Sequence, residues 1–307
     1  MTDRASFVHA DDLLTVTVSF HPEQRALLAQ LETLPMECLK VVVDNGSNEI
    51  ELAFLRQLAD RIPNTVLVEN AANVGLAAAI NQGLRYGLAA RDGLRWCLLL
   101  DQDTEPESGA VEILLDGIRE LQREGDAVGC VGPSLVDVET GLSHGFHQAT
   151  RFRWRRAYPA PRSRGPIRCT TLNGSGTLMP VSLFKDLGGL DERLFIDHID
   201  TEWSFRVLAA RRTLWGLPQA VFHHRMGERS LRYWLFGWRV MPYRSPPRHR
   251  YLFRNTVWLL RRAYVPAVWK FWAVAKLGLT MAAYLAFSKE RRQQIAGMVS
   301  GLGAGLK

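Results

Sequence analysis

Two carboxylates lie one residue apart in the segment Asp101-Gln102-Asp103, directly after the most apolar run of the chain, Trp96–Leu100. Carboxylates at this spacing in a turn can reach one divalent cation. Oxygen ligands suit Mg²⁺ or Mn²⁺, which keep coordination positions open for substrate phosphates. The alternative is a pair of turn-forming or helix-capping aspartates, because Pro106 stands where a helix could start. The position after a buried strand favours the metal site.

Polar residues also follow two earlier apolar runs. Asp44 begins the turn 44–48, where Asn-Gly supplies the turn geometry. Its carboxylate either accepts a hydrogen bond from the imide N–H of a nucleobase or forms an Asx turn. In the later segment, Gly75 and the alanines after it allow close backbone approach, and helix N-terminal N–H groups favour anionic groups. Asn81 needs a hydrogen-bond partner if it is buried.

Acidic and aromatic side chains gather before and within a predicted helix near 200–211: Phe195, Asp197, Asp200, Glu202 and Trp203. A transfer reaction to a hydroxyl needs one ionised carboxylate within hydrogen-bond reach, a contribution of about 10²–10⁴-fold. Aromatic rings beside it can stack on a sugar. The alternative is an N-cap plus a surface ion pair between Glu202 and Arg206. We interpret His198 as a structural or rim residue.

Predicted strands and helices, which must position these residues, alternate over the first 135 residues. Apolar runs predict strands at Leu13–Phe20, Leu39–Val43, Thr65–Glu69, Arg95–Leu100 and Ala127–Val131, and helical patterns lie near 22–34, 49–61, 74–90 and 106–124. This rhythm predicts a mostly parallel α/β sheet with helices on both faces. Ligands of such sheets bind beyond the carboxyl ends of the strands, where the polar segments lie.

The second half of the chain is less regular. We predict a solvated loop over 138–168, a strand-like segment over 169–179 and a helix near 181–187. A loop at 191–200, the helix near 200–211 and a short strand at 213–217 follow. We expect the loop 172–179 to form part of the wall around an acceptor.

Together these segments resemble the family 2 glycosyltransferases of the GT-A fold, and most closely the bacterial rhamnosyltransferases that use dTDP-L-rhamnose. The resemblance rests on VDNGSN (43–48), NVGLAAAINQG (73–83), LLLDQD (98–103), TLNGSGTLM (171–179), DERLFIDHIDTEW (191–203), HRMG (224–227) and the pair Arg254–Asn255. It covers roughly residues 12–260. It implies the GT-A fold, with a mostly parallel central sheet.

The resemblance also implies roles for individual positions. The nucleotide-sugar site would comprise Ser19, Phe20, Asp44, Asn73, Gly75, Asn81, Asp101 and Gln102. Asp44 would read the base, Asp103 would bind Mg²⁺ or Mn²⁺, and Asp200 would be the catalytic base. The segment HRMG suggests that His224 contacts the metal ion or the diphosphate. His223 is the alternative residue for this role.

The chain departs from the family pattern before its proposed base. Ile199 replaces the usual glutamate, which leaves a second-acid or acceptor role open for Asp197, Glu202 or Trp203. Inversion requires one base and no enzyme nucleophile. The resemblance therefore implies an inverting, metal-dependent transfer of L-rhamnose to a lipid-linked or cell-surface glycan acceptor. A UDP-hexose or UDP-N-acetylhexosamine donor is the alternative within the family.

Charge divides the chain unevenly. Residues 1–204 hold 19 Lys and Arg against 29 Asp and Glu, whereas residues 205–307 hold 19 basic residues against Glu228 and Glu290. We predict a GT-A catalytic domain over 1–230, with a nucleotide half (12–135) and an acceptor half (136–230), and a basic helical extension over 231–307. Within residues 251–288 of this extension, the longest uncharged run, Leu277–Ser288, is too short to span a bilayer. We expect the extension to contact an anionic membrane surface, or else to pack on the body.

Composition excludes several classes of protein. Apolar residues make up 47% and charged residues 22%, which argues against a disordered or collagen-like chain. Four separated cysteines and no secretory signal favour a reducing, cytoplasmic compartment at the inner face of the membrane. A nucleic-acid-binding module could use the basic tail, but it leaves the acidic motifs unused, so we expect no nucleic-acid partner. A catalytically inactive nucleotide-sugar-binding scaffold is the other alternative.

Overall fold

A mixed sheet forms the centre of the computed structural model, which describes residues 10–159, 163, 165–224, 230–234 and 238–307. In this part of the chain the sheet comprises β1 (Leu13–Ser19), β2 (Leu39–Asp44), β3 (Thr65–Glu69), β4 (Trp96–Asp101), β5 (Thr104–Pro106), β6 (Val128–Asp137), β9 (Ile167–Cys169), β10 (Leu178–Pro180) and β11 (Thr213–His224). The strand order is β3-β2-β1-β4-β10-β6-β11-β5, with β9 paired to β11. β3, β2, β1 and β4 are parallel, and β10 runs antiparallel between β4 and β6.

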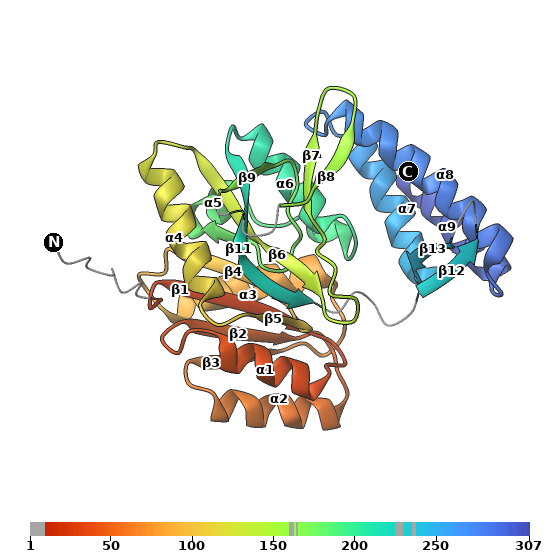
Figure 1. The fold of residues 1–307 in the computed structure, drawn as a ribbon. Helices are drawn as coiled ribbons and strands as arrows, with labels where there is room; N and C mark the ends of the chain where they lie inside the picture. Colours follow the sequence, from red (N-terminus) through yellow and green to blue (C-terminus); the bar gives the residue numbers. More distant parts are fainter. Residues whose placement is uncertain (1–9, 160–162, 164, 225–229, 235–237) are drawn as a thin grey trace.

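Helices cover both faces of the sheet, as predicted (Figure 1). α1 (Gln24–Thr33), α2 (Glu49–Arg61) and α4 (Ala110–Arg123) pack into one apolar cluster. α3 (Leu76–Ala90), α5 (Val181–Asp186) and α6 (Ile199–Ala209) pack into the other. The near-continuous apolar strands explain the two cores, because a strand buried on both faces needs apolar side chains in both directions.

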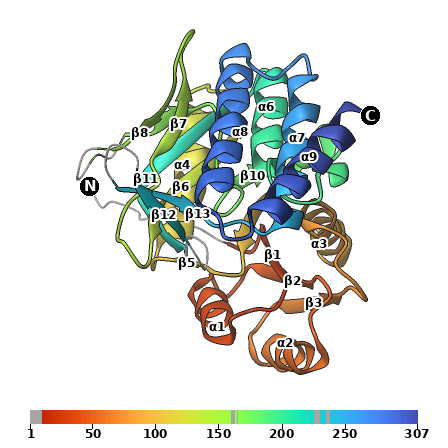
Figure 2. The same ribbon diagram turned by 90° about the vertical axis from the view of Figure 1, so that its right-hand side faces the viewer.

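Three helices follow a two-stranded sheet of β12 (Ser230–Trp234) and β13 (Trp238–Pro242): α7 (Pro246–Leu260), α8 (Ala267–Phe287) and α9 (Arg291–Leu306). Gly297, Gly301 and Gly305 recur once per turn of α9 and lie against the α7 backbone, where a side chain would collide with carbonyl oxygens. Figure 2 shows these helices together at one side of the sheet.

Of the three C-terminal helices, α7 and α8 also pack on the part of the chain that contains the central sheet. Leu259, Val265 and Trp269 belong to the same buried cluster as the sheet and α6. In the described part of the chain, no helix is both long and apolar enough to cross a bilayer. The division at residues 230 and 231 into two domains stays a prediction.

The structure differs from the predicted elements mainly in the second half. The loop predicted over 138–168 contains a hairpin, β7 (Phe146–Ala149) and β8 (Trp154–Ala157), and then β9. The strand predicted over 169–179 was wrong in its middle, where Gly176 adopts a φ of +81° and turns the chain. β5 was not predicted, and β6 and β11 extend further than their apolar cores. In these segments the partner strand decides the conformation.

Gly83 on α3 tests how closely this helix packs on the sheet. A Cβ atom there would lie 2.7 Å from Val16 Cγ1 and 2.8 Å from Val43 Cγ2. We expect Gly83→Ala to lower the free energy of unfolding by about 1–3 kcal/mol, because an overpacked core must shift. Gly278→Ala is the control: its Cβ on α8 meets nothing within 4 Å, so stability should rise by up to about 1 kcal/mol. Urea unfolding measures both, and an unchanged Gly83→Ala protein would contradict the close packing.

Candidate functional site

The carboxyl ends of three parallel strands bring distant polar residues to one edge of the sheet. Ser19 at the end of β1 lies opposite Asp44 at the end of β2, and Val18 lies opposite Asp101 at the end of β4. The sequence prediction that these segments meet is therefore confirmed at the level of the backbone. Ser19 is buried, and its hydroxyl has no hydrogen-bond partner among the described residues.

Asp44 forms the Asx turn that was one of its two interpretations. Its carboxylate accepts hydrogen bonds from the backbone N–H groups of Gly46 and Ser47, at 3.2 and 3.1 Å. Asn48 then caps α2 in a capping box with Glu51. Each carboxylate oxygen can accept more than one hydrogen bond, so contact with a base stays a prediction.

Asn45 is a buried side-chain amide to which the sequence analysis assigned no role. It connects the turn after β2 to the segment before α3. Its Oδ1 accepts a hydrogen bond from the Val74 N–H, and its Nδ2 donates to Asn73 Oδ1. Asn73 Oδ1 also accepts from the N–H of Gly75, which has a φ of +92° and lies against the Phe195 ring. Only glycine suits this position, because a Cβ atom would lie 2.6 Å from that ring.

Asn81 and Gln102 act as bridges between segments. Asn81 is buried, and its amide has the hydrogen-bond partners that a buried amide needs. It exchanges hydrogen bonds with the backbone of Leu190 and donates to Glu192. Gln102 makes two hydrogen bonds with the backbone of Phe20, whose ring remains 41% exposed. Gln102 thus holds the chain after β1 against the turn that carries both aspartates.

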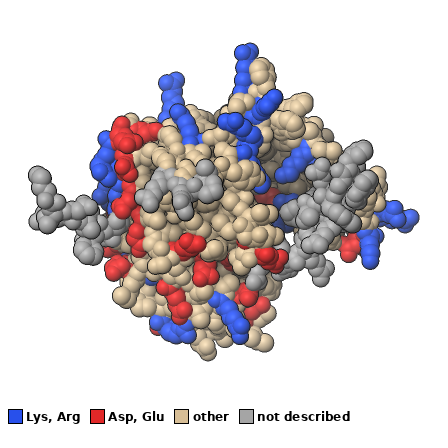
Figure 3. All heavy atoms as spheres, in the orientation of Figure 1, with Lys and Arg blue, Asp and Glu red and all other residues tan. Residues whose placement is uncertain are grey.

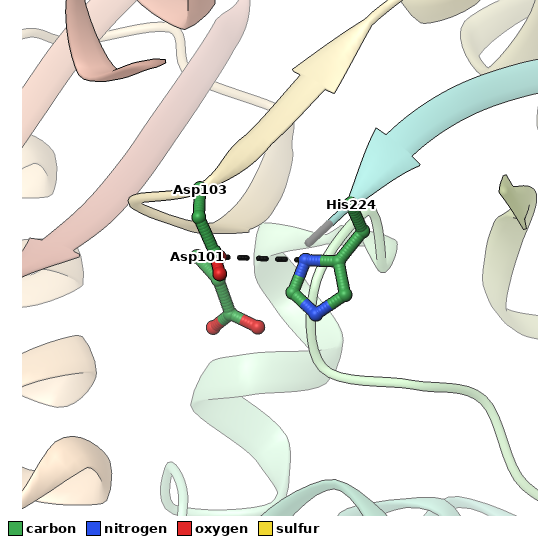
Figure 4. Close-up of side chains that lie close together, drawn as sticks. All are labelled: Asp101, Asp103 and His224. Carbon is green, nitrogen blue, oxygen red and sulfur yellow. Dashed lines mark ion pairs between the residues drawn. The ribbon is translucent and has the colours of Figure 1, made fainter. Parts of the chain in front are cut away.

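Asp101, Asp103 and His224 form a candidate metal centre. Among the described residues, they form the group of at least three potential ligands whose carboxylate or imidazole donor atoms all lie within 4.8 Å of one another. Figure 4 shows the three side chains converging from the β4–β5 turn and the end of β11. The Nδ1 atom of His224 lies 3.4 Å from Asp103 Oδ1. Two carboxylates and one imidazole are a donor set that fits Mn²⁺ or Mg²⁺.

The pairing of β5 with β11 decides which histidine faces the site. Thr104 lies opposite His224, and its hydroxyl lies 2.8 Å from His224 Nδ1. His223, on the opposite side of the strand, lies 2.9 Å from Glu107 Oε1 instead. Geometry therefore favours His224 over His223, which the sequence could not decide. Residues 225–227 of the HRMG segment lie outside the described residues.

The carboxylates at this centre repel one another. Burial raises the pKa of Asp101 to about 6, and the carboxylates of Asp103 and Asp200 add to this rise, whereas His224 and Arg248 oppose it. Crowded carboxylates favour a bound cation, because a positive charge removes the repulsion.

Gln30 holds the turn that carries the two aspartates, although the sequence analysis assigned it no role. It is fully buried. Its Nε2 donates to the carbonyl oxygens of Asp101 and Thr104, at 2.6 and 2.5 Å, and its Oε1 accepts from the Thr17 hydroxyl. A glutamine on the apolar face of the predicted helix 22–34 was the available signal, because a buried amide needs partners.

Asp200 begins α6 beside the loop 173–175. Its Oδ1 accepts the Thr201 N–H at 2.7 Å. Burial raises the pKa of Asp200 and the Asp197 carboxylate adds to this rise, whereas hydrogen bonds from Thr201 and Gly174 lower it. The same loop reaches the aspartate turn through Ser175, whose Oγ accepts the Asp101 N–H at 2.9 Å. Asp200 and the candidate metal centre thus share one wall.

The three remaining candidates near Asp200 differ in their surroundings. Asp197 lies 3.3 Å from Arg248 and 3.7 Å from Arg244. Glu202 is 1% exposed and accepts hydrogen bonds from Arg206, Arg262 and Tyr264. Trp203 is 3% exposed and belongs to the core. Hydrogen bonds already use the Glu202 carboxylate, and packing in the core already uses Trp203, which leaves Asp197 as the candidate second acid.

The loop before Asp200 has an unusual backbone that α7 supports. Phe195, Asp197 and His198 have φ values of 63°, 65° and 64°, in the left-handed region that non-glycine residues rarely adopt. Such residues persist where the surroundings hold them. Asn255 on α7 does so: it is fully buried, and its Nδ2 donates to the carbonyl oxygens of Leu194, Ile196 and Asp197, at 2.8, 2.8 and 3.0 Å.

Comparison with known proteins shows that the chain is similar to enzymes that transfer sugars. Residues 25–188 match the family described as glycosyl transferase family 2. A dTDP-rhamnosyl transferase, RfbF of Shigella flexneri, is 28% identical over 256 residues, which cover 83% of this chain and 82% of the relative. An N-acetylglucosaminyl-diphospho-decaprenol L-rhamnosyltransferase of Mycobacterium tuberculosis is 28% identical over 236 residues, 69% of this chain and 75% of the relative.

Solved structures show the same fold. A crystal structure of GalNAc-T7 with UDP, GalNAc and Mn²⁺ superimposes with a TM-score of 0.59 at 17% identity. The match covers 93% of this chain but only 54% of that one. The mannosyltransferase PcManGT from Pyrobaculum calidifontis, in complex with GDP-Man and Mn²⁺, gives a TM-score of 0.54 at 15% identity and covers 96% of this chain and 87% of that one. The predicted GT-A fold is thereby confirmed.

Asn255→Ala tests the support of the loop before Asp200. The variant leaves three carbonyl groups without their donor, so we expect the loop to shift and kcat to fall by about 100-fold. The donor KM should change little, because the turns at Asp44 and Asp101 do not contact Asn255. Steady-state kinetics separates the two constants. An equal loss through donor KM would contradict a local role, and a thermal melt verifies that the variant is folded.

Proposed function

The chain belongs to glycosyl transferase family 2, and we propose that within this family it transfers L-rhamnose from dTDP-L-rhamnose to a lipid-linked glycan acceptor with inversion. The observation that carries the catalytic part is the common wall formed by the strand ends, the loop 173–175 and α6. It joins the candidate metal-binding side chains to the carboxylate of Asp200, whose pKa burial raises. The donor and acceptor are supported by the two rhamnosyltransferase relatives.

In the proposed mechanism Asp200 is the general base. Its carboxylate accepts the proton of the acceptor hydroxyl while that oxygen attacks the anomeric carbon, and the bond from this carbon to the diphosphate oxygen breaks with its electron pair leaving on the diphosphate. A carboxylate whose pKa is raised, as burial does for Asp200, accepts a proton more readily. One base and one displacement invert the anomeric centre.

The remaining residues bind and orient the donor. We propose that Asp44, Asn73, Gly75 and the chain after β1 surround the nucleoside, and that Asp101 and Gln102 face the ribose and phosphates. Asp103 and His224, with Asp101, would hold Mg²⁺ or Mn²⁺, which supplies positive charge to the leaving diphosphate.

Asp200→Asn tests the base. We expect kcat to fall by about 10²–10⁴-fold, because the amide cannot accept the proton, while binding of the nucleotide-sugar remains. The matched control is Asp60→Asn on the exposed side of α2, which should keep full turnover. Product formation and donor affinity are measured separately. An Asp200→Asn enzyme that keeps most of its turnover would show that the base lies elsewhere.

A thermal-shift panel tests the donor and the metal. Among dTDP-L-rhamnose, UDP-glucose, UDP-galactose and UDP-N-acetylglucosamine with Mn²⁺ or Mg²⁺, we expect dTDP-L-rhamnose to stabilise most. A ligand at 100 times its Kd adds about 2.7 kcal/mol. EDTA or Asp103→Asn should remove most of this shift, since each removes a link between protein and diphosphate. A larger shift with a UDP-sugar would overturn the proposed donor.

We propose further that the enzyme works at the inner face of the cytoplasmic membrane, with α8 in contact with the bilayer surface. Phe271, Val274 and Leu285 lie along one side of α8 and are 69%, 54% and 55% exposed. Basic residues, Lys289, Arg291 and Arg292, follow this helix. An exposed apolar side with cations beside it suits an anionic bilayer surface.

Substitution of this apolar side tests the membrane contact. We expect Phe271→Ser with Leu285→Ser to weaken binding to phosphatidylglycerol vesicles by about 10-fold or more, because two large apolar side chains leave the interface. Met36→Ser with Ile50→Ser is the matched control, since these residues are 65% and 79% exposed in the nucleotide-binding half. Vesicle sedimentation measures both. Deletion of the extension is unsuitable, because Trp269 belongs to the body core.

A further inference from the structure

Two arginine side chains at the start of α7 lie beside Asp197, and two further cations come from α8 and β8, which are in contact with each other. We call them the acceptor-side cations; they are Arg156 on β8, Arg244 before α7, Arg248 on α7 and Lys276 on α8. Figure 2 shows α8 beside the β7–β8 hairpin, and the two elements are in contact. Figure 3 shows Lys and Arg side chains projecting over this hairpin and the helices next to it, whereas most Asp and Glu lie over α4 and the lower half of that face.

The described neighbours of these cations supply too little negative charge to balance them. Asp197 pairs with Arg248 at 3.3 Å and lies 3.7 Å from Arg244 Nε. That Nε atom is buried and has no hydrogen-bond partner among the described residues. Arg156 has a histidine rather than a carboxylate as its partner, with Nε 3.1 Å from His147 Nε2. Asp197 thus pairs with two of the cations, and the ion pairs of the described residues give no carboxylate partner to Arg156 or Lys276.

The electrostatics of the neighbouring groups supports this excess. Burial lowers the pKa of His147 to about 4, and Arg156 and Lys276 lower it further. Lys276 keeps exposed surface, but the protein around it removes water and lowers the pKa of its ammonium group. Arg244 and Arg156 lower this pKa further, and Asp197 opposes them. An anion bound here would remove repulsion among like charges.

The position of the acceptor-side cations relates them to the reaction. Asp197 lies three residues before the proposed base Asp200, and Arg248 acts on the Asp101 carboxylate. The donor diphosphate already has its own site at Asp101, Asp103 and His224. The hydroxyl must approach from the side of Asp200, so an acceptor would extend from Asp200 toward α8 and β8.

We propose that the acceptor-side cations bind the diphosphate of the acceptor, an ester that joins the acceptor sugar to its lipid. This inference rests on the proposed function and identifies the part of the acceptor that the enzyme recognises. Arginine suits such a group because its planar fork binds phosphate oxygens in pairs. The acceptor sugar would then lie between the diphosphate and Asp200, with its free hydroxyl directed at the base.

Direct binding of farnesyl diphosphate tests the proposal without turnover. Titration calorimetry is done in EDTA, which prevents the metal centre from binding the diphosphate. We expect the wild type to bind farnesyl diphosphate more tightly than farnesol or inorganic pyrophosphate. Arg156→Gln with Lys276→Met should weaken this binding by about 10-fold or more, because two charge-assisted contacts are lost. Arg151→Gln with Lys185→Met, an equal loss of charge at exposed positions, should leave it unchanged.

A second set of measurements distinguishes the sources of phosphate. The double variant should keep the thermal shift with dTDP-L-rhamnose and Mn²⁺, and it should bind phosphatidylglycerol vesicles as the Arg151→Gln with Lys185→Met control does. A selective loss of vesicle binding, with farnesyl diphosphate binding retained, would assign the cations to membrane headgroups and overturn the proposal. Arg156→Gln alone serves as a milder variant if the double variant melts early.

The outcomes separate this inference from the proposed function. Equal affinity of wild type and double variant for farnesyl diphosphate, or no preference of the wild type over farnesol, would overturn the acceptor-diphosphate site whatever sugar is transferred. Selective loss of farnesyl diphosphate binding together with no turnover of dTDP-L-rhamnose would support the site and refute the proposed donor.

Discussion

The candidate site depends on the satisfaction of backbone groups in irregular segments by buried amide side chains. A turn at a sheet edge leaves N–H and C=O groups without a ladder partner, and such groups must find one when buried. Gln30 serves the turn at Asp101, Asn45 serves the segment before α3, and Asn255 serves the loop before Asp200. Each amide comes from another part of the chain than the segment it supports. These three segments therefore gain their hydrogen-bond partners only once the whole fold has formed.

Charge is arranged in the opposite sense on the two sides of the site. The donor side concentrates carboxylates whose repulsion a divalent cation would remove, and Asp101 shows this most clearly. The acceptor side concentrates cations around Asp197. In the proposed function, two anionic substrates would be held apart, one through a metal ion and one directly by arginine and lysine. Asp200 lies between these regions, where burial raises its pKa.

The C-terminal helices connect the proposed base to the proposed acceptor site. α7 supplies Asn255 to the loop before Asp200 and Arg248 to the cations, and α8 supplies Lys276. The opposite side of α8 exposes Phe271. A helix that contacts both the acceptor region and, as proposed, the bilayer would present the lipid end of an acceptor to the surface from which it comes.

The sequence alone determined the first half of the fold and the positions of the main carboxylates. Strong periodicity predicted β1 to β4 and α1 to α4 within a few residues, because a buried parallel strand needs an unbroken apolar run. The motifs at Asp44 and Asp101 could be placed at strand ends for the same reason.

Only the tertiary structure decided what depends on partners far along the chain. It separated His224 from His223 through the pairing of β5 with β11. It committed Glu202 and Trp203 to packing and assigned roles to Gln30, Asn45 and Asn255. The local sequence pattern shows which face of an element is buried. The partner of a buried polar atom is set by contacts between residues far apart in the chain, 71 positions for Gln30 and Asp101 and 109 for Asn81 and Leu190.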